Sequence, residues 1–234
     1  SNPQPLTPNP SLRIMGVVNA TPDSFSDGGQ FLDPAAAIRH GLKLAEDGAD
    51  ILDIGGESTR PGADDVPATE EIARTLPVIE GLKREKVQAM LSIDTRKPEV
   101  ARAAIEAGAE IWNDVTALTY APDSVETAAA LSCYLVLMHA QGDPKTMQKD
   151  PSYDDVVEEV YAYLARRIET CVGAGVAESR IIVDPGVGFG KTMTHNLLLL
   201  ANLSRFCDLG RPVLLGASRK RFIGALDRNA PASE

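Results

Sequence analysis

Short, continuous apolar runs alternate with amphipathic stretches along the chain. The runs are rich in β-branched residues, and such runs are typical of strands buried on both faces of a parallel sheet. They predict strands over residues 12–19, 50–56, 89–95, 110–115, 133–140, 180–186 and 212–218. The stretches between them predict helices over residues 34–47, 70–84, 98–107, 124–131, 154–172 and 195–206. Strict alternation of strands and helices predicts an α/β protein with a parallel sheet.

Two local signals support these units. Asp33-Pro34 and Thr69-Glu70-Glu71 each offer a capping oxygen followed by proline or acids, which favours the start of a helix. The segments "EDGADILDIG" and "EAGAEIWNDV" resemble each other, and each passes from a helix through a glycine, Gly48 or Gly108, into a strand. Repeated βα units and the chain length favour a (β/α)8 TIM barrel over an open doubly wound sheet.

Composition narrows the class of protein. The 234 residues are 44% hydrophobic and 24% charged, which suits one large domain with a substantial core. We expect residues 12–234 to form a single barrel domain, truncated before strand eight, behind a flexible tail at residues 1–11. The net charge of −10 argues against nucleic acid or an anionic membrane as partner. No apolar run reaches the ~20 residues of a membrane helix. Three scattered cysteines without a metal-ligand spacing indicate reduced thiols in a cytoplasmic protein.

Polar residues follow every predicted strand. In a barrel of this class the active site lies where the carboxyl ends of the strands meet. The polar residues at these ends are Asn19, Glu57 to Arg60, Asp94, Asn113, Asp114, His139, Asp184 and Ser218 to Lys220. One such residue alone is more often a helix cap or a turn former. Their recurrence at successive strand ends favours a shared site. We expect Trp112 in the core, His139 as a pocket-lining candidate and His195 at the start of a helix.

The segment "VDPGVGFGKT" (183–192) resembles a phosphate-binding loop, but Pro185 stands where the first glycine of that motif belongs. The glycine spacing does not match a dinucleotide-binding loop either. Two carboxylates, a carboxamide and a lysine suit an uncharged flat heterocycle, with Asp184 facing an N–H and NH₂ pair and Lys220 facing a ring carbonyl. The segment is therefore predicted to form the floor of a ring pocket, in which the glycines permit close approach and Phe189 presents a face.

A second group of candidates lies in "NATPDSFSDGG" (19–29) and "GGESTRPG" (55–62). Arginine, hydroxyl and carboxamide oxygen together suit a phosphate with bound Mg²⁺, and Arg60, Thr59 and Asn19 supply these groups. The alternative is a pair of long, solvated, turn-rich loops.

Six motifs in order make the chain similar to one family. They are "IMGVVNATPDSFSDGG", "DIGGESTRPGA", "LSIDT", "WNDV", "DPGVGFGKT" and "GASRKRFIG", from about residue 12 to 226. Together they closely resemble the dihydropteroate synthase family, the pterin-binding barrel enzymes of folate biosynthesis and the target of sulfonamides. The resemblance implies a transferase that condenses 6-hydroxymethyl-7,8-dihydropterin pyrophosphate with p-aminobenzoate, giving 7,8-dihydropteroate and pyrophosphate, and it implies a homodimer.

The resemblance also implies a role for each matching position. Pterin would be bound by Asp94, Asn113, Asp184, Lys220 and Phe189. Pyrophosphate and p-aminobenzoate would be bound by Thr59, Arg60, Pro61, Phe25 and Ser218, and Asn19 would coordinate Mg²⁺. Asp94, Lys220 and Arg60 would take part in catalysis. The family's eighth strand carries an Arg-x-His pair for the pyrophosphate, and the sequence ends before that point.

Two other functions are compatible with parts of this pattern. A methyltetrahydrofolate-dependent corrinoid methyltransferase would use a pterin site similar to Asp94, Asn113 and Asp184. It has no use for the motifs that serve pyrophosphate and arylamine, and it would need a cobalamin partner. A non-catalytic pterin-binding module would need neither the phosphate nor the amine pocket.

Overall fold

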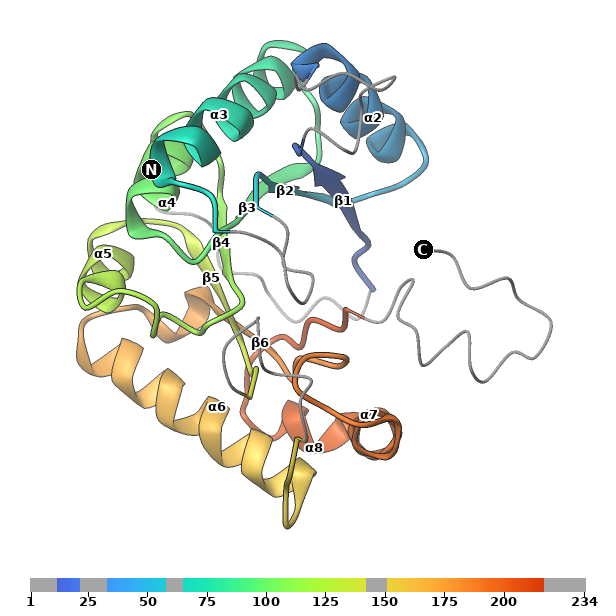
Figure 1. Cartoon of the computed structure of the whole chain (residues 1–234), viewed down its shortest axis with the longest axis vertical. Coiled ribbons are helices and arrows are strands. Elements are labelled where there is room, and N and C mark those ends of the chain that lie inside the picture. Colours follow the sequence, from blue (N-terminus) through green and yellow to red (C-terminus); the bar gives the residue numbers. More distant parts are fainter. Residues whose placement is uncertain (1–11, 22–32, 58–64, 142–150, 217–234) are drawn as a thin grey trace, which may run out of the picture.

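A computed structural model describes residues 12–21, 33–57, 65–141 and 151–216. Its strands are all parallel and are paired in chain order from β1 to β6. Their bounds are Met15–Asn19 (β1), Ile51–Gly55 (β2), Met90–Asp94 (β3), Ile111–Asp114 (β4), Tyr134–Met138 (β5) and Ile181–Asp184 (β6). Figure 1 shows the strands in the middle and the helices around them. The predicted α/β barrel class is confirmed.

The helices follow the strands one by one and cover the outer face of the sheet (Figure 1). Their bounds are Pro34–Glu46 (α2), Ala68–Arg84 (α3), Pro98–Glu106 (α4), Ser124–Ala130 (α5), Val156–Gly173 (α6), Met193–Ala201 (α7) and Leu203–Cys207 (α8), with a short 3₁₀ turn at Glu178–Arg180 (η1). Among the described residues, no helix is long and apolar enough to cross a membrane.

Two apolar clusters divide the sheet into an outer and an inner face. The larger cluster joins strand residues such as Leu52, Leu91 and Trp112 to the helices. The smaller one consists of Ile51, Ile111, Tyr134, Val136 and Ile182, with Met15, Met90 and Leu214 packed against it. Because side chains alternate along a strand, this second set occupies the inner face of the barrel. The next inward positions of β2, β3, β4 and β6 are polar (Asp53, Ser92, Asn113 and Asp184), so a polar layer lies beyond the apolar one on these strands.

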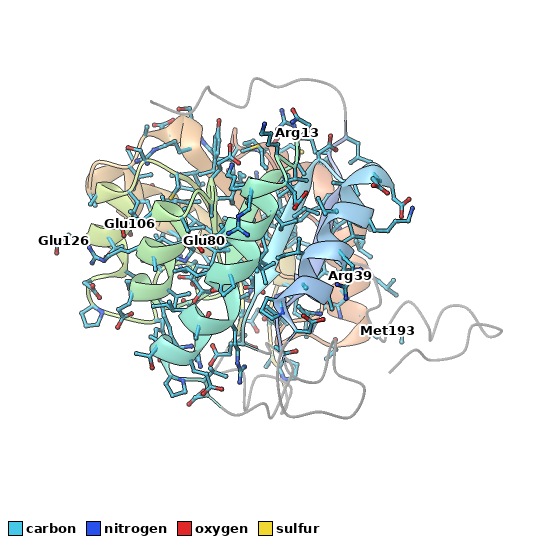
Figure 2. The ribbon with its side chains drawn as sticks, turned by 90° about the horizontal axis from the view of Figure 1, so that it is seen from above. Arg13, Arg39, Glu80, Glu106, Glu126 and Met193 are labelled. Atoms are coloured by element: carbon cyan, nitrogen blue, oxygen red, sulfur yellow. The ribbon has the colours of Figure 1, made fainter. Side chains whose placement is uncertain are left out.

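The carboxyl ends of the strands all lie at one end of the molecule. Figure 2 shows Arg13, which precedes β1, and Met193, which begins α7 after β6, at opposite ends. The polar layer is therefore at the same end as Met193. This is the end at which the active site of such a barrel is expected.

Two local predictions are wrong, and one is met in part. Of the strand predicted over 212–218, the described residues form an isolated parallel bridge between Val213 and Val183, and residues 217–218 lie outside the described residues. The helix predicted over 195–206 is two helices, because Asn202 leaves helical geometry (φ −113, ψ 28). Thr69 does not cap α3, since the helix begins at Ala68, its N-cap residue is Pro67 and no side chain caps it; the carbonyl of Pro67 accepts from the N–H groups of Glu70 and Glu71.

Four others are confirmed. The Asp33 side chain accepts a hydrogen bond from the N–H of Ala35 and caps α2. Gly48 and Gly108 have φ of 104 and 109, the left-handed backbone that the joint between a helix and a strand requires. The indole of Trp112 is fully buried, and His195 is at the third position of α7, in a capping box with Thr192. The expected tail at residues 1–11 lies outside the described residues.

Candidate functional site

Strand register brings the predicted residues of β3 and β4 together at the carboxyl end of the barrel. Asp94 is the register partner of Gly55 on one side and of Asn113 on the other. Asn113 donates from Nδ2 to Oδ2 of Asp53, at 2.9 Å, across the inner face of β3. Asp53, Asp94 and Asn113 therefore form one continuous polar group.

Sequence reasoning missed Asp53. It lies in the middle of the apolar run "DILDIGG", where one acid gives no signal of function by itself. Its side chain is only 6% exposed, and Oδ1 has no hydrogen-bond partner in the described residues. A buried carboxylate oxygen without a donor is costly, so it marks a place where a ligand donor would be favourable.

Two carboxyl groups of this layer, those of Asp53 and Asp94, are hard to ionise. Burial raises the pKa of Asp53. The pKa of Asp94 is raised well above its ordinary value, first by burial and then by the negative charges of Asp53, Glu71, Asp114 and Glu57. A ligand that brings N–H donors or positive charge to Asp94 would favour its ionised form.

Asp184 lies at the corresponding end of β6. It is 6% exposed, and its Oδ1 accepts from the N–H of Gly186 at 2.7 Å. The backbone carbonyl of Asp184 accepts from the N–H of His139, which fixes the end of β6 beside the end of β5. Asp184 therefore faces the same end of the barrel as Asp94 and Asn113.

The glycine-rich turn after β6 is held by Lys191. The Lys191 ammonium is buried and donates to the carbonyl oxygens of His139, Gly186 and Phe189 at 3.2, 2.9 and 2.9 Å. It also lies 3.0 Å from Nδ1 of His139. The Lys191 ammonium thus binds backbone carbonyl oxygens of its own turn and of His139. This agrees with the prediction that the segment is no phosphate loop.

The glycines of the turn serve its own packing. Gly186, Gly188 and Gly190 have φ of 67, 87 and 60. A Cβ on Gly186 would lie 1.8 Å from the carbonyl oxygen of His139, and one on Gly190 would lie 2.6 Å from that of Gln141. The close approach that the sequence predicted is therefore made to the end of β5. Phe189, in the same turn, is part-exposed.

The two polar residues of β4 have different surroundings. Asn113 faces the inside, whereas Asp114 is fully buried and accepts from Thr116 N–H, Thr116 Oγ1 and Leu118 N–H at 2.7 to 2.9 Å. Burial raises the pKa of Asp114 to about 6, although these donors oppose the shift. Asp114 orders the turn after β4 and is not part of the inner polar layer.

His139 follows β5 and is 7% exposed. Burial and the neighbouring Lys191 cation lower the pKa of His139 to about 3. Its ring meets that of Tyr163 edge-on at 4.9 Å. The imidazole is therefore neutral and firmly packed, which suits a supporting role at the end of β5.

Asn19 is exposed at the end of β1 and is the register partner of Gly55 in β2. Gly55 is in turn the partner of Asp94, so β2 lies between Asn19 and Asp94. In the described parts of the chain, no three His, Cys, Asp or Glu side chains are grouped to hold a metal ion. The remaining predicted site residues, Phe25, Thr59, Arg60, Pro61, Ser218 and Lys220, lie outside the described residues.

The profile of one protein family, described as pterin binding enzyme, matches residues 15–233. The chain belongs to the pterin binding enzyme family. Curated relatives in this family are similar over most of the chain. Dihydropteroate synthase of Haemophilus influenzae is 47% identical over 214 residues, which cover 92% of this chain and 77% of the relative. That of Escherichia coli is 45% identical over 219 residues, which cover 94% and 77%.

Solved structures of pterin binding enzymes have the same fold. Dihydropteroate synthase of Xanthomonas albilineans with 4-aminobenzoic acid has a TM-score of 0.87 and 53% identity, covering 94% of this chain and 78% of that one. The same enzyme in complex with 7,8-dihydropteroate has a TM-score of 0.83 and 49% identity over the same shares. The Yersinia pestis enzyme, with a sulfonamide drug, has a TM-score of 0.87 and 43% identity, covering 94% and 79%.

Proposed function

We propose that this chain is a dihydropteroate synthase, a transferase that joins 6-hydroxymethyl-7,8-dihydropterin pyrophosphate to p-aminobenzoate. One observation carries the proposal. The inner face of the barrel ends in a layer of three acids and a carboxamide, in a chain of the pterin binding enzyme family. Asp53 and Asp184 are buried, and Asp94 and Asn113 are part-buried. Carboxyl groups with little exposure to water suit a flat, neutral ring with several N–H donors.

Each member of this layer has a role in the proposed complex. Asp184 would accept from the N–H and NH₂ edge of the pterin, and Asn113, held by Asp53, would pair with neighbouring ring atoms. Lys220 would donate to the ring carbonyl, and Phe189 would lie against the ring face. The support is the described geometry of Asp184 and Asn113 together with the motifs around Phe189 and Lys220.

Asp94 is the residue best suited to stabilise positive charge. In a dissociative reaction the carbon–oxygen bond to pyrophosphate breaks first, and its electron pair leaves with the oxygen. The ring then carries positive charge until the arylamine nitrogen bonds to the exocyclic carbon and loses its proton. Because Asp94 ionises more readily beside a cation, its carboxylate would bind this state more tightly than the neutral substrate. A neutral arylamine needs little help from a general base.

Pyrophosphate and p-aminobenzoate would be bound beside the pterin at the same end of the barrel, by Thr59, Arg60, Pro61, Phe25 and Ser218. Mg²⁺ fits this site, since it prefers oxygen ligands and commonly takes one or two from the protein and the rest from phosphate and water. The exposed carboxamide of Asn19 would supply the protein oxygen. The ion would neutralise charge on the leaving group.

The proposal includes the oligomeric state of the enzyme and its cellular compartment. The family resemblance implies a homodimer, which sedimentation would test. The cysteines Cys133, Cys171 and Cys207 are free thiols, as expected in a cytoplasmic enzyme.

The proposal is tested by measuring p-aminobenzoate-dependent release of pyrophosphate from the dihydropterin pyrophosphate in the presence of Mg²⁺. Asp184→Asn should lower kcat/KM roughly 10²-fold, because a substrate donor loses its charged acceptor. Asp208→Asn is a matched control, since Asp208 pairs with Arg205 on the surface of the molecule. A wild-type chain that binds pterin without turnover would be a binding module. Methyl transfer to a corrinoid would favour the methyltransferase instead.

A further inference from the structure

Arg96 is the centre of a charged cluster beside the polar layer. It lies two residues after Asp94 and donates from Nε and Nη2 to both carboxylate oxygens of Glu57, at 3.2 and 3.4 Å. Nη2 also donates to Oδ1 of Asp65 at 2.8 Å. The guanidinium carbon lies 4.5 Å from the ring centroid of Tyr120. One side chain therefore joins the segments that follow β2, β3 and β4.

Lys97 extends this cluster toward α3. Its ammonium donates to Glu57 at 2.9 Å and to Glu71 at 2.7 Å, and the Glu71 side chain is fully buried. Glu57 also accepts from the backbone N–H of Val66 at 2.9 Å. Glu57, Asp65, Glu71, Arg96 and Lys97 are called the Glu57 cluster below.

Glu57 and Arg96 hold each other in their charged forms. Burial alone would favour neutral Glu57, but hydrogen bonds from Lys97, Val66 and Arg96 outweigh it and lower the pKa of Glu57. The carboxylates in turn keep the pKa of Arg96 raised despite burial. The side chains of Arg96 and Glu57 are only 13% and 11% exposed, so water competes little for their hydrogen bonds. A planar guanidinium that bonds two acids and stacks on a ring fixes their relative positions, which a lysine cannot do.

The two acids held by Arg96 stand on either side of one functional segment of the sequence. Glu57 immediately precedes residues 58–64 and Asp65 immediately follows them. In the proposed function, this segment contributes Thr59, Arg60 and Pro61. We propose that Arg96 is a positioning residue for the p-aminobenzoate step: without touching the substrate, it fixes Glu57 and Asp65, the residues on either side of the segment that carries these side chains, relative to β3. The inference rests on the proposed function for the role of those side chains.

The test is the steady-state kinetics of Arg96→Gln, with p-aminobenzoate and the dihydropterin pyrophosphate varied in turn. We expect the KM for p-aminobenzoate to rise roughly ten-fold, while kcat and the Kd for pterin change less than about three-fold. Arg96→Lys keeps the positive charge but loses the two-pronged hydrogen bond to Glu57, so its KM for p-aminobenzoate should lie between those of wild type and Arg96→Gln. A purely structural role would instead move both substrates' constants and the melting temperature together.

Asp65→Asn is a second variant that avoids the risk of misfolding, since the Asp65 side chain is 62% exposed. It should raise the KM for p-aminobenzoate roughly three-fold. When it is added to Arg96→Gln the further rise should be smaller, because the two residues act through one contact. Arg102→Gln is the matched control. Arg102 pairs with Asp123 at 3.2 Å on the flank of the barrel and should leave all constants unchanged.

The outcomes separate this inference from the proposed function. A folded Arg96→Gln protein with a wild-type KM for p-aminobenzoate would overturn the inference and leave the proposed function standing. An equal rise in the KM for p-aminobenzoate in Arg102→Gln would also overturn the inference and leave the proposed function standing. A wild-type chain without p-aminobenzoate-dependent turnover would overturn both.

Discussion

Among single residues, the contact between His139 and Lys191 shows how a functional-looking histidine becomes a structural one. The Lys191 ammonium lies 3.0 Å from His139 Nδ1, so the imidazole accepts there and cannot take a proton at low cost. Burial and this cation lower the pKa of His139 to about 3. Its neutral form is therefore part of what stabilises the folded protein.

This contact predicts a pH dependence of stability. A histidine with a pKa of about 6.5 in the unfolded chain takes up a proton there before it does so in the folded one. The stability that neutral His139 contributes is present above pH 6.5 and is lost as the pH falls toward 3. Between about pH 7.5 and 5.5 the free energy of unfolding should fall by about 1.4 kcal/mol from this group. His139→Asn keeps an acceptor for Lys191 and should remove that part of the slope.

Urea unfolding at the two pH values measures the difference. His40→Asn is the control, because His40 is exposed on α2. If His139→Asn and wild type lose equal stability on acidification, His139 is not held neutral by its surroundings.

Among the elements, the turn between β6 and α7 requires glycine at position 186. Gly186 combines φ of +67 with backbone contact, since an added Cβ would lie 1.8 Å from the His139 carbonyl oxygen. Gly210 has the same φ of +67 but no atom within 4 Å of such a Cβ in the described part of the chain. The two glycines therefore separate the effect of conformation from the effect of space.

Gly210→Ala should cost about 1–2 kcal/mol of stability, the cost of a left-handed backbone for alanine. Gly186→Ala should cost about 4 kcal/mol or more, because the turn must also move away from β5. Thermal unfolding of both variants measures this. Equal losses would mean that the turn can shift freely and that the end of β5 does not fix it.

At the scale of the whole molecule, the net charge of −10 repels the anionic substrate that this protein is proposed to bind. Binding must therefore rely on local groups, chiefly the polar layer and the cations of the motifs around it. Ligand binding should stabilise the entire fold, because the layer joins strands from β2 to β6.

A pterin ligand at about one hundred times its Kd should raise the free energy of unfolding by about 2.7 kcal/mol. A thermal shift assay without p-aminobenzoate measures this independently of turnover. Asp184→Asn should lose most of the shift at the same ligand concentration, and Asp208→Asn should retain it. A shift that persists in Asp184→Asn would place the pterin elsewhere.

Sequence pattern alone accounts for the class of fold and for most of the described polar layer. Parallel strands buried on both faces need continuous apolar runs, and polar residues that end such runs must lie at one end of the barrel. The pattern is therefore sufficient to place Asp94, Asn113 and Asp184 at that end of the barrel. The helix joints at Gly48 and Gly108 are predictable for a similar reason, since left-handed backbone is a local requirement.

Contacts between distant residues, in contrast, are set by the folded molecule. Asp53 joins the layer through Asn113, 60 residues away, and nothing in its own run says that it faces inward. Asp114, next to Asn113, orders a loop instead of joining the layer. Arg96 holds Glu57, 39 residues earlier in the chain. Local pattern specifies which segments form strands and helices, whereas the partner of a buried charge depends on the packing of segments that lie far apart in the sequence.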